Sequence, residues 1–229
     1  MNSFVGAYYL QTPAHWLDQI DPERALLRGK AYACAKRVMD VALVLIGLPV
    51  ILPLMALCVL AIKLESPSAP ALFVQKRTGR GGRRFGMYKF RTMVSNAEEL
   101  KQQYAHLNEL QFPDFKITDD PRITRVGRIL RKTSLDELPQ VINVLCGDMS
   151  MVGPRPTSFS ASTYKLWHTE RLDVVPGITG LWQLLGRGST EFDERLRLDI
   201  AYIKRRCLSL DFQILLRTVP AVLAGKGAA

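Results

Sequence analysis

The sequence holds few of the residues on which metal sites and nucleophilic hydrolases are usually built. Its 229 residues include four cysteines and three histidines. The cysteines are far apart, form no C-x-x-C pair and have no histidine at metal-ligand spacing, so we expect reduced thiols in a reducing compartment. No Ser-His-Asp or Cys-His signature surrounds the histidines. Catalysis by this chain would therefore depend on carboxylates.

Acidic residues are also few relative to basic ones. The 31 Lys and Arg outnumber the 21 Asp and Glu, which gives a formal net charge of +10. Such an excess favours a polyanionic partner: nucleic acid, an anionic membrane face or phosphorylated substrates. The chain has no nucleic-acid-binding signature, and its aromatic residues are not interleaved with the basic ones. We therefore expect no nucleic-acid partner, and a basic membrane-anchored adaptor remains the alternative to an enzyme.

One apolar run stands out against this charged background. It extends over about 22 residues, from Val41 to Ile62, which is long enough to span a bilayer. A soluble core helix rarely continues so far without a polar face. Basic residues stand on both sides, with Lys36 and Arg37 before the run and Lys63 after it. Because positive residues stay on the cytoplasmic side, both flanks are expected on that side.

Two prolines near the middle of the run reconcile these observations. Pro49 and Pro53 can break a helix, so we favour a re-entrant hairpin that returns to the face it entered over a straight span. Asp40 lies near the entry point and is expected to pair with Lys36 or Arg37, because a lone acid there is costly. The predicted division is an N-terminal extension (1–33), a re-entrant membrane helix (34–64) and a cytoplasmic catalytic domain (65–229).

The stretch "RKTSLDELPQ" places two carboxylates, Asp136 and Glu137, side by side. Ser134 and Glu137 fit the S-x-x-E pattern of a capping box at a helix N-terminus. Pro139 would then fall in the second turn, where its missing N–H removes a helical hydrogen bond. A reactive carboxylate pair is the other interpretation. The two are compatible, because a helix N-terminus also suits a phosphate.

Two further stretches concern phosphate. "GRGGRRFGMYKFRTM" combines glycines with basic residues, among them Lys89 and Arg91. It suits either a phosphate-binding turn or a basic hairpin on anionic lipid. In "MSMVGPRPT", Pro154 and Pro156 flank Arg155 and would fix the direction of its guanidinium, which can bind phosphate through two parallel hydrogen bonds. A surface turn with an incidental arginine is the plain alternative.

The remaining pattern predicts a helix-rich α+β fold. Short strands are expected around the Gly-rich turn, and helices over "SNAEELKQQYAHLNELQ" and "EFDERLRLDIAYIKRR". In the second helix Phe192, Leu196, Ile200 and Ile203 share a face. The C-terminal "SLDFQILLRTVPAVLAG" fits an interfacial amphipathic helix on the membrane and a packed terminal helix equally well.

Several segments together have a familiar order. They are "KRVMD", the broken apolar run, "FVQKRTG", "YKFRTM", "DDPRITRVGRILRKTSLDELPQVINVLCGDMSMVGPRP", "PGITGLWQLLGR", "LDIAYI" and "SLDFQILLRT". This order resembles the bacterial sugar transferases, the monotopic polyprenyl-phosphate phosphoglycosyl transferases that initiate exopolysaccharide and O-antigen synthesis. The resemblance covers roughly residues 34 to 225, and its central block from Asp119 to Pro156 is highly specific.

The resemblance implies a reaction and a place in the cell. Such enzymes move a phospho-sugar from a nucleotide-diphosphate sugar, usually a UDP-sugar, onto polyprenyl phosphate and release UMP. Mg²⁺ assists them, and they work on the cytoplasmic face of the bacterial inner membrane among anionic lipids. A homo-oligomer is compatible with this picture, and the sequence does not name the sugar.

The resemblance also assigns roles to residues. Asp136 would be the nucleophile that forms a covalent phospho-sugar intermediate and a ligand of Mg²⁺, with Glu137 as its partner. The phosphates and the nucleotide would be bound by Arg131, by Arg155 within Pro154–Pro156, and by Lys89 and Arg91.

Overall fold

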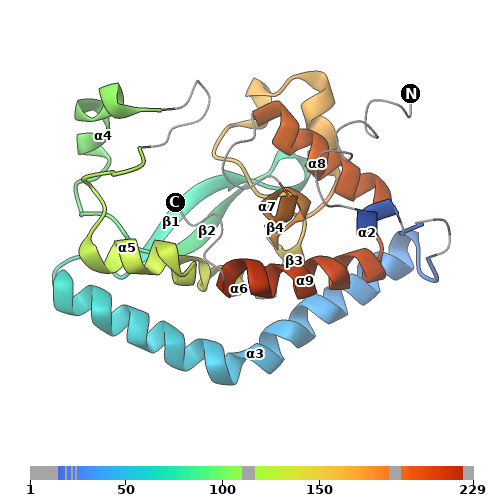
Figure 1. The fold of residues 1–229 in the computed structure, drawn as a ribbon, viewed down its shortest axis with the longest axis horizontal. Helices are drawn as coiled ribbons and strands as arrows, with labels where there is room; N and C mark the ends of the chain where they lie inside the picture. Colours follow the sequence, from blue (N-terminus) through green and yellow to red (C-terminus); the bar gives the residue numbers. More distant parts are fainter. Residues whose placement is uncertain are drawn as a thin grey trace.

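The computed structural model describes residues 15–18, 20–21, 23, 25–109, 117–185 and 192–223. Residues 1–14 of the expected extension and the end of "PGITGLWQLLGR" lie outside these residues. The helices are α2 (His15–Asp18), α3 (Gly29–Glu65), α4 (Glu99–Gln103), α5 (Arg125–Lys132), α6 (Gln140–Cys146), α7 (Leu181–Leu185), α8 (Phe192–Arg205) and α9 (Leu208–Leu223). The strands are β1 (Leu72–Thr78), β2 (Arg84–Phe90), β3 (Ser150–Val152) and β4 (Gly177–Thr179). The predicted helix-rich α+β fold is confirmed (Figure 1).

Two small sheets organise the described chain. β1 and β2 form an antiparallel hairpin in which Leu72 pairs with Phe90 and Thr78 with Arg84. The Gly-rich turn between them occupies the hairpin tip, as the sequence predicted. β3 and β4 form a short parallel pair, with Val152 opposite Thr179. Apolar side chains of both sheets join the core, so the sheets connect α3 on one side with α7, α8 and α9 on the other.

The predicted apolar run lies within α3, a helix of 37 residues that contains both prolines. Figure 1 shows α3 bent near its middle, with both halves rising toward the rest of the molecule. A proline removes one helical hydrogen bond and crowds the preceding turn, which is the usual cause of such a bend. By length and composition α3 is the one helix in the described part of the chain that could cross a membrane.

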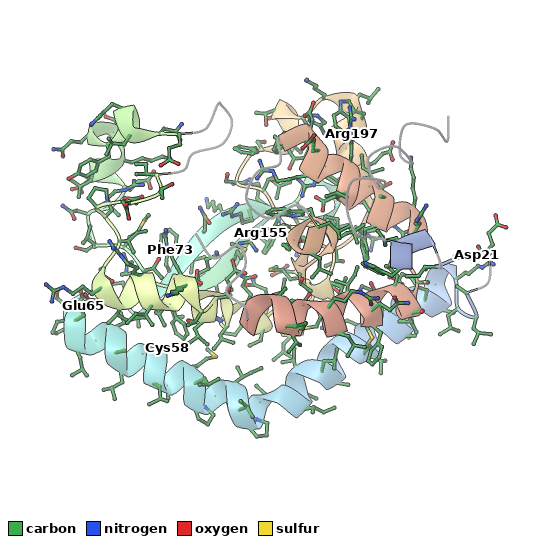
Figure 2. All side chains as sticks on the ribbon, viewed as in Figure 1. Asp21, Cys58, Glu65, Phe73, Arg155 and Arg197 are labelled. Atoms are coloured by element: carbon green, nitrogen blue, oxygen red, sulfur yellow. The ribbon has the colours of Figure 1, made fainter. Side chains whose placement is uncertain are left out.

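The middle of α3 is apolar and uncovered, whereas both halves are packed. Ile46 and Val50 are 76% and 65% exposed, which would be unfavourable in water. In the first half, Val44 packs with residues of β2 and α6. In the second half, Ile62 packs with Phe90 of β2 and with α5. Glu65 accepts hydrogen bonds from two N–H groups at the start of α5, and Figure 2 shows it beside that helix.

The basic residues at the start of α3 have partners other than the one expected from the sequence. Lys36 pairs with Asp211 of α9 at 3.1 Å. Arg37 donates to the carbonyl oxygens of Val144 and Leu145 at the C-terminal end of α6, which suits the negative end of that helix dipole. Asp40 is buried and accepts a hydrogen bond from the Met151 N–H at 3.1 Å. No ion pair of Asp40 with Lys36 or Arg37 is found among the described residues, although the charge of Lys36 acts on Asp40, and a β3 amide also donates to its carboxylate.

α9 combines the two interpretations that the sequence left open. Leu210 and Ile214 are fully buried in the core, so the helix is packed on one side. Phe212, Leu216 and Val219 are each more than half exposed. α9 therefore presents a second apolar face that the described chain does not cover.

Candidate active site

The two carboxylates lie on a sharp turn between α5 and α6. Ser134, directly after α5, has φ of 57°, and among the described residues it is the one non-glycine residue in the left-handed region. Leu135–Glu137 then form a 3-10 turn, and α6 begins after Pro139. The expected capping box is wrong, because the Ser134 side chain makes no capping hydrogen bond. Pro139 instead precedes the helix, where its missing N–H has no consequence.

Glu137 is held by two cations. Lys89 Nζ lies 2.9 Å from Glu137 Oε1. Arg155 donates to both carboxylate oxygens, with NH1 at 3.2 Å from Oε2. The same ammonium of Lys89 lies 3.7 Å from Asp136 Oδ2. Lys89 therefore joins the two acids, whereas Arg155 contacts only Glu137.

The pKa values of the two neighbouring acids are consequently shifted in opposite directions. Burial raises the pKa of the Asp136 carboxyl above its ordinary value, and the charge of Lys89 offsets part of that rise. Burial also opposes ionisation of Glu137, but Arg155 and Lys89 outweigh it and hold the pKa of Glu137 well below its ordinary range. Glu137 is thus a fixed counter-ion, while Asp136 is an acid with few fixed contacts. A weakly paired, buried carboxylate is the better nucleophile of the two.

Arg131 approaches the same pair from α5. Its Nε donates to Thr92 Oγ1 at 2.9 Å, and its charge acts on Asp136. The helix lies close against the chain here: a Cβ added at Gly127 would stand 2.1 Å from the Thr92 carbonyl oxygen. Thr92 therefore sets the position of both α5 and the Arg131 guanidinium. Sequence reasoning missed this threonine, although it stands within the "YKFRTM" segment.

Arg91 makes its contacts elsewhere on the hairpin. Its Nε donates to the Pro70 carbonyl oxygen at 2.8 Å, and its guanidinium lies over the ring of Phe73. The structure brings Lys89, Arg131 and Arg155 to the acids but does not place Arg91 with them. A role for Arg91 in anion binding stays a prediction.

The Pro-Arg-Pro segment directly follows β3 and is fixed from several sides. Pro154 and Pro156 are buried. The Pro154 carbonyl accepts from Gly177 N at 2.9 Å, and the Pro156 carbonyl accepts from Arg77 at 3.2 Å. Arg155 lies near the centre of Figure 2. In this fixed segment Arg155 is directed toward Glu137, and its predicted binding of phosphate stays a prediction.

The donor set can hold a magnesium ion only together with a substrate. Among the described residues no group of three or more His, Cys, Asp or Glu side chains is placed to bind a metal. Glu137 is occupied by cations, which leaves the Asp136 carboxylate. Mg²⁺ in phosphoryl-transfer sites is commonly bound by one or two carboxylates plus substrate phosphates and water. The residues present fit that kind of site.

Comparison with known proteins gives the same family throughout. A profile of the family described as "Bacterial sugar transferase" matches residues 31–225. The chain is 44% identical over 200 residues to "Galactosyl transferase CpsE" of Streptococcus agalactiae, a match that covers 86% of this chain. It is 45% identical over 204 residues to "UDP-glucose:undecaprenyl-phosphate glucose-1-phosphate transferase" of Caulobacter vibrioides, which covers 84% of this chain.

The relatives differ in length. The chain spans 44% of the streptococcal relative and 71% of the one from Caulobacter. It spans 88% of "Exopolysaccharide production protein ExoY" of Sinorhizobium fredii, to which it is 36% identical over 199 residues. The residues that match the family profile, 31–225, include all but the first two residues of α3, the carboxylate pair and the Pro-Arg-Pro segment. The chain belongs to the bacterial sugar transferase family.

Proposed function

We propose that this chain transfers a sugar 1-phosphate from a UDP-sugar to a polyprenyl phosphate, giving a polyprenyl-diphosphate sugar and UMP. The observation that carries the proposal is the asymmetry of the acid pair. Glu137 is occupied by Lys89 and Arg155, while the one ion pair of buried Asp136 among the described residues is the 3.7 Å contact with Lys89. The printed names of the Caulobacter relative and of a Salmonella typhimurium relative describe the same class of transfer to undecaprenyl phosphate.

In this proposal the reaction proceeds in two displacements. An oxygen of the ionised Asp136 attacks the sugar-bearing phosphorus of the donor, the bond from that phosphorus to the bridging oxygen breaks, and UMP leaves with the electron pair. A phosphate oxygen of the acceptor then attacks the same phosphorus and restores the Asp136 carboxylate. Each step exchanges one P–O bond for another and needs no net proton. A covalent intermediate divides one difficult transfer between two anions into two easier ones.

Fixed positive charge makes these steps feasible. Two anionic substrates must meet beside two carboxylates, and the transition state spreads negative charge over the phosphoryl oxygens. Arg131 and Lys89 flank Asp136, so their charges are in place before reaction. Mg²⁺ held by Asp136 and the substrate phosphates would add further charge neutralisation.

The membrane position of the site is part of the proposal. We infer that α3 enters the cytoplasmic leaflet, bends at Pro49 and Pro53 and returns to the same face. The packing of both halves of α3 against β2 supports this, because a straight span would separate those halves by the bilayer. Its exposed apolar middle supports it too. The arrangement would keep Asp136 near the depth of a lipid phosphate.

A transfer assay tests the chemistry. Membranes containing the chain are incubated with radiolabelled UDP-sugars, Mg²⁺ and polyprenyl phosphate, and label is followed into the organic phase. We expect the wild-type protein to transfer label. Asp136→Asn should abolish both the transfer and the protein-bound label. Asp173 is an exposed acid of the same domain, and Asp173→Asn should change neither. An adaptor gives no transfer at all, and a diphosphate hydrolase releases label to water. Near-normal transfer by Asp136→Asn would refute the covalent mechanism.

Thiol labelling tests the topology. Cys34 is exposed at the start of α3, and Ser68→Cys adds an exposed thiol after its end. Both thiols are expected to react with an impermeant reagent only when it has access to the cytoplasmic side. Labelling of one thiol from each side would mean that α3 crosses the bilayer.

A further inference from the structure

Arg77, which sequence reasoning did not single out, lies against the Pro-Arg-Pro segment. It stands near the end of β1, where the Thr78 N–H donates to the Thr157 carbonyl at 2.9 Å. Arg77 NH1 donates to the Pro156 carbonyl at 3.2 Å, and its Nε donates to Gln75 Oε1 at 3.0 Å. The guanidinium is therefore fixed beside Arg155, by strand and loop together.

The described contacts of Arg77 do not balance its charge. Arg77 is partly buried, and a guanidinium with reduced access to water usually has a carboxylate partner. The acceptors of Arg77 are neutral, an amide oxygen and a backbone carbonyl. Burial and the like charge of Arg155 lower the pKa of Arg77 to about 10, and Glu137 offsets only part of this. Since Glu137 already binds Lys89 and Arg155, the charge of Arg77 remains in excess.

The guanidinium also retains hydrogen-bonding capacity. An arginine has five N–H donors. The described contacts use Nε and one N–H each of NH1 and NH2, which leaves two N–H groups. A planar fork with excess charge and spare donors is suited to phosphate oxygens.

The charges follow an order that matches a diphosphate. Asp136 is acted on by Lys89, Arg131 and Arg155. The contacts run from Asp136 through Lys89, Glu137 and Arg155 to Pro156, the next residue, whose carbonyl accepts from Arg77. In the proposed reaction the leaving group departs opposite the attacking carboxylate. A donor whose reacting phosphorus faces Asp136 would bring its second phosphate toward Arg155 and Arg77.

We propose that Arg77 binds the nucleotide phosphate of the donor, the phosphate that leaves as UMP, together with Arg155. The inference rests on the proposed function and names a contact of that same site. While the P–O bond breaks, negative charge grows on the UMP oxygen, and Arg77 stabilises that charge. In the absence of the donor the same guanidinium is an unfavourable, unbalanced charge.

Binding of UMP and uridine to the full chain in nanodiscs tests this role by calorimetry. Arg77→Gln should weaken UMP binding about 10- to 100-fold, the range for hydrogen bonds to charged groups, and Arg77→Lys should fall between. Uridine, which lacks the phosphate, should bind both proteins equally. The matched control is Lys76→Gln, which removes one charge from the exposed neighbour on the same strand and should change UMP binding less than two-fold.

The melting temperature of the unliganded protein distinguishes phosphate binding by Arg77 from a purely structural role. Removal of an unbalanced charge should leave the melting temperature of Arg77→Gln at or above that of Lys76→Gln, and UMP should stabilise it less than wild type. The inference would be overturned if Arg77→Gln left the UMP affinity unchanged or weakened UMP and uridine equally. If the wild-type protein still formed the covalent intermediate, the proposed function would stand. If UMP binding depended on Arg77 but no covalent intermediate formed, only the proposed function would be refuted. Wild-type protein that does not bind UMP would refute both.

Discussion

Replacement of Glu137 by glutamine tests whether this acid is the counter-ion of the site. The side chains of Glu137 and Lys89 are 19% and 17% exposed and 2.9 Å apart. Two unit charges at that distance attract by roughly 6 kcal/mol at an effective dielectric constant of about 20, and desolvation offsets part of this. Glutamine keeps the shape and one acceptor but leaves Lys89 and Arg155 without their anion. Breaking a buried pair typically costs about 3–5 kcal/mol, and partial exposure favours the lower end.

A loss of about 3 kcal/mol corresponds to a fall in melting temperature of about 6–12 °C for a chain of this size. The assay is thermal unfolding of the full chain in nanodiscs. The control is Glu98→Gln, whose glutamate is 89% exposed in a pair with Lys101 at 3.7 Å. Such a surface pair contributes little, so the control should shift the melting temperature by only one or two degrees.

The pH dependence of stability gives a second test of the role of Glu137. The pKa of Glu137 is lower in the folded chain than its ordinary value of 4.5. Its stabilisation is therefore fully present above that value and is lost as the pH falls through the folded pKa. The gap between wild type and Glu137→Gln should be constant above about pH 5.5 and should shrink below pH 4.5. Equal melting temperatures for Glu137→Gln and Glu98→Gln at pH 7 would refute the counter-ion argument.

Three other changes probe the nucleophile, the bend and the position of α5. Lys89→Met removes the main charge that opposes the raised pKa of Asp136, so the acid limb of intermediate formation should move to higher pH in quenched-flow labelling. Pro49→Ala with Pro53→Ala should straighten α3, and a thiol added after α3 should then become accessible from the outer side. Gly127→Ala places a Cβ 2.1 Å from a backbone carbonyl oxygen and should lower the unfolding free energy by about 1–3 kcal/mol, measured by denaturant titration.

The sequence predicted the parts of the fold that depend on local pattern. The apolar run with its prolines became α3, and the Gly-rich turn became the tip of the β1–β2 hairpin. In α8 the expected face was only partly right, because Leu198 and Tyr202 are buried while Ile200 and Ile203 are half-buried. Contacts from α7, the Leu166–Asp173 turn and α9 decide which side of that helix is covered, and the helical period alone does not contain them.

The candidate site was predictable in its residues but not in its pairings. The chemistry of adjacent acids and the resemblance both pointed to Asp136 and Glu137. Which acid receives Lys89 and Arg155 depends on contacts between residues 18 to 48 positions apart along the chain, and no local pattern encodes these. Asp40 illustrates the same limit, since a backbone N–H 111 positions away donates to its carboxylate.

The order of residues in "LDEL" links the carboxylate pair to α3. Leu135 and Leu138 pack against the cluster that contains Phe90 of β2 and Cys58 and Ile62 of α3. The two acids between them face the cations of the site instead. One short turn thus has an apolar side on α3 and a charged side toward Lys89 and Arg155. The turn follows Ser134, whose left-handed backbone conformation is strained. The apolar contacts with α3 and the ion pairs with Lys89 would both resist a rotation of this segment. The depth of α3 in the leaflet would then set the height of the nucleophile above the lipid.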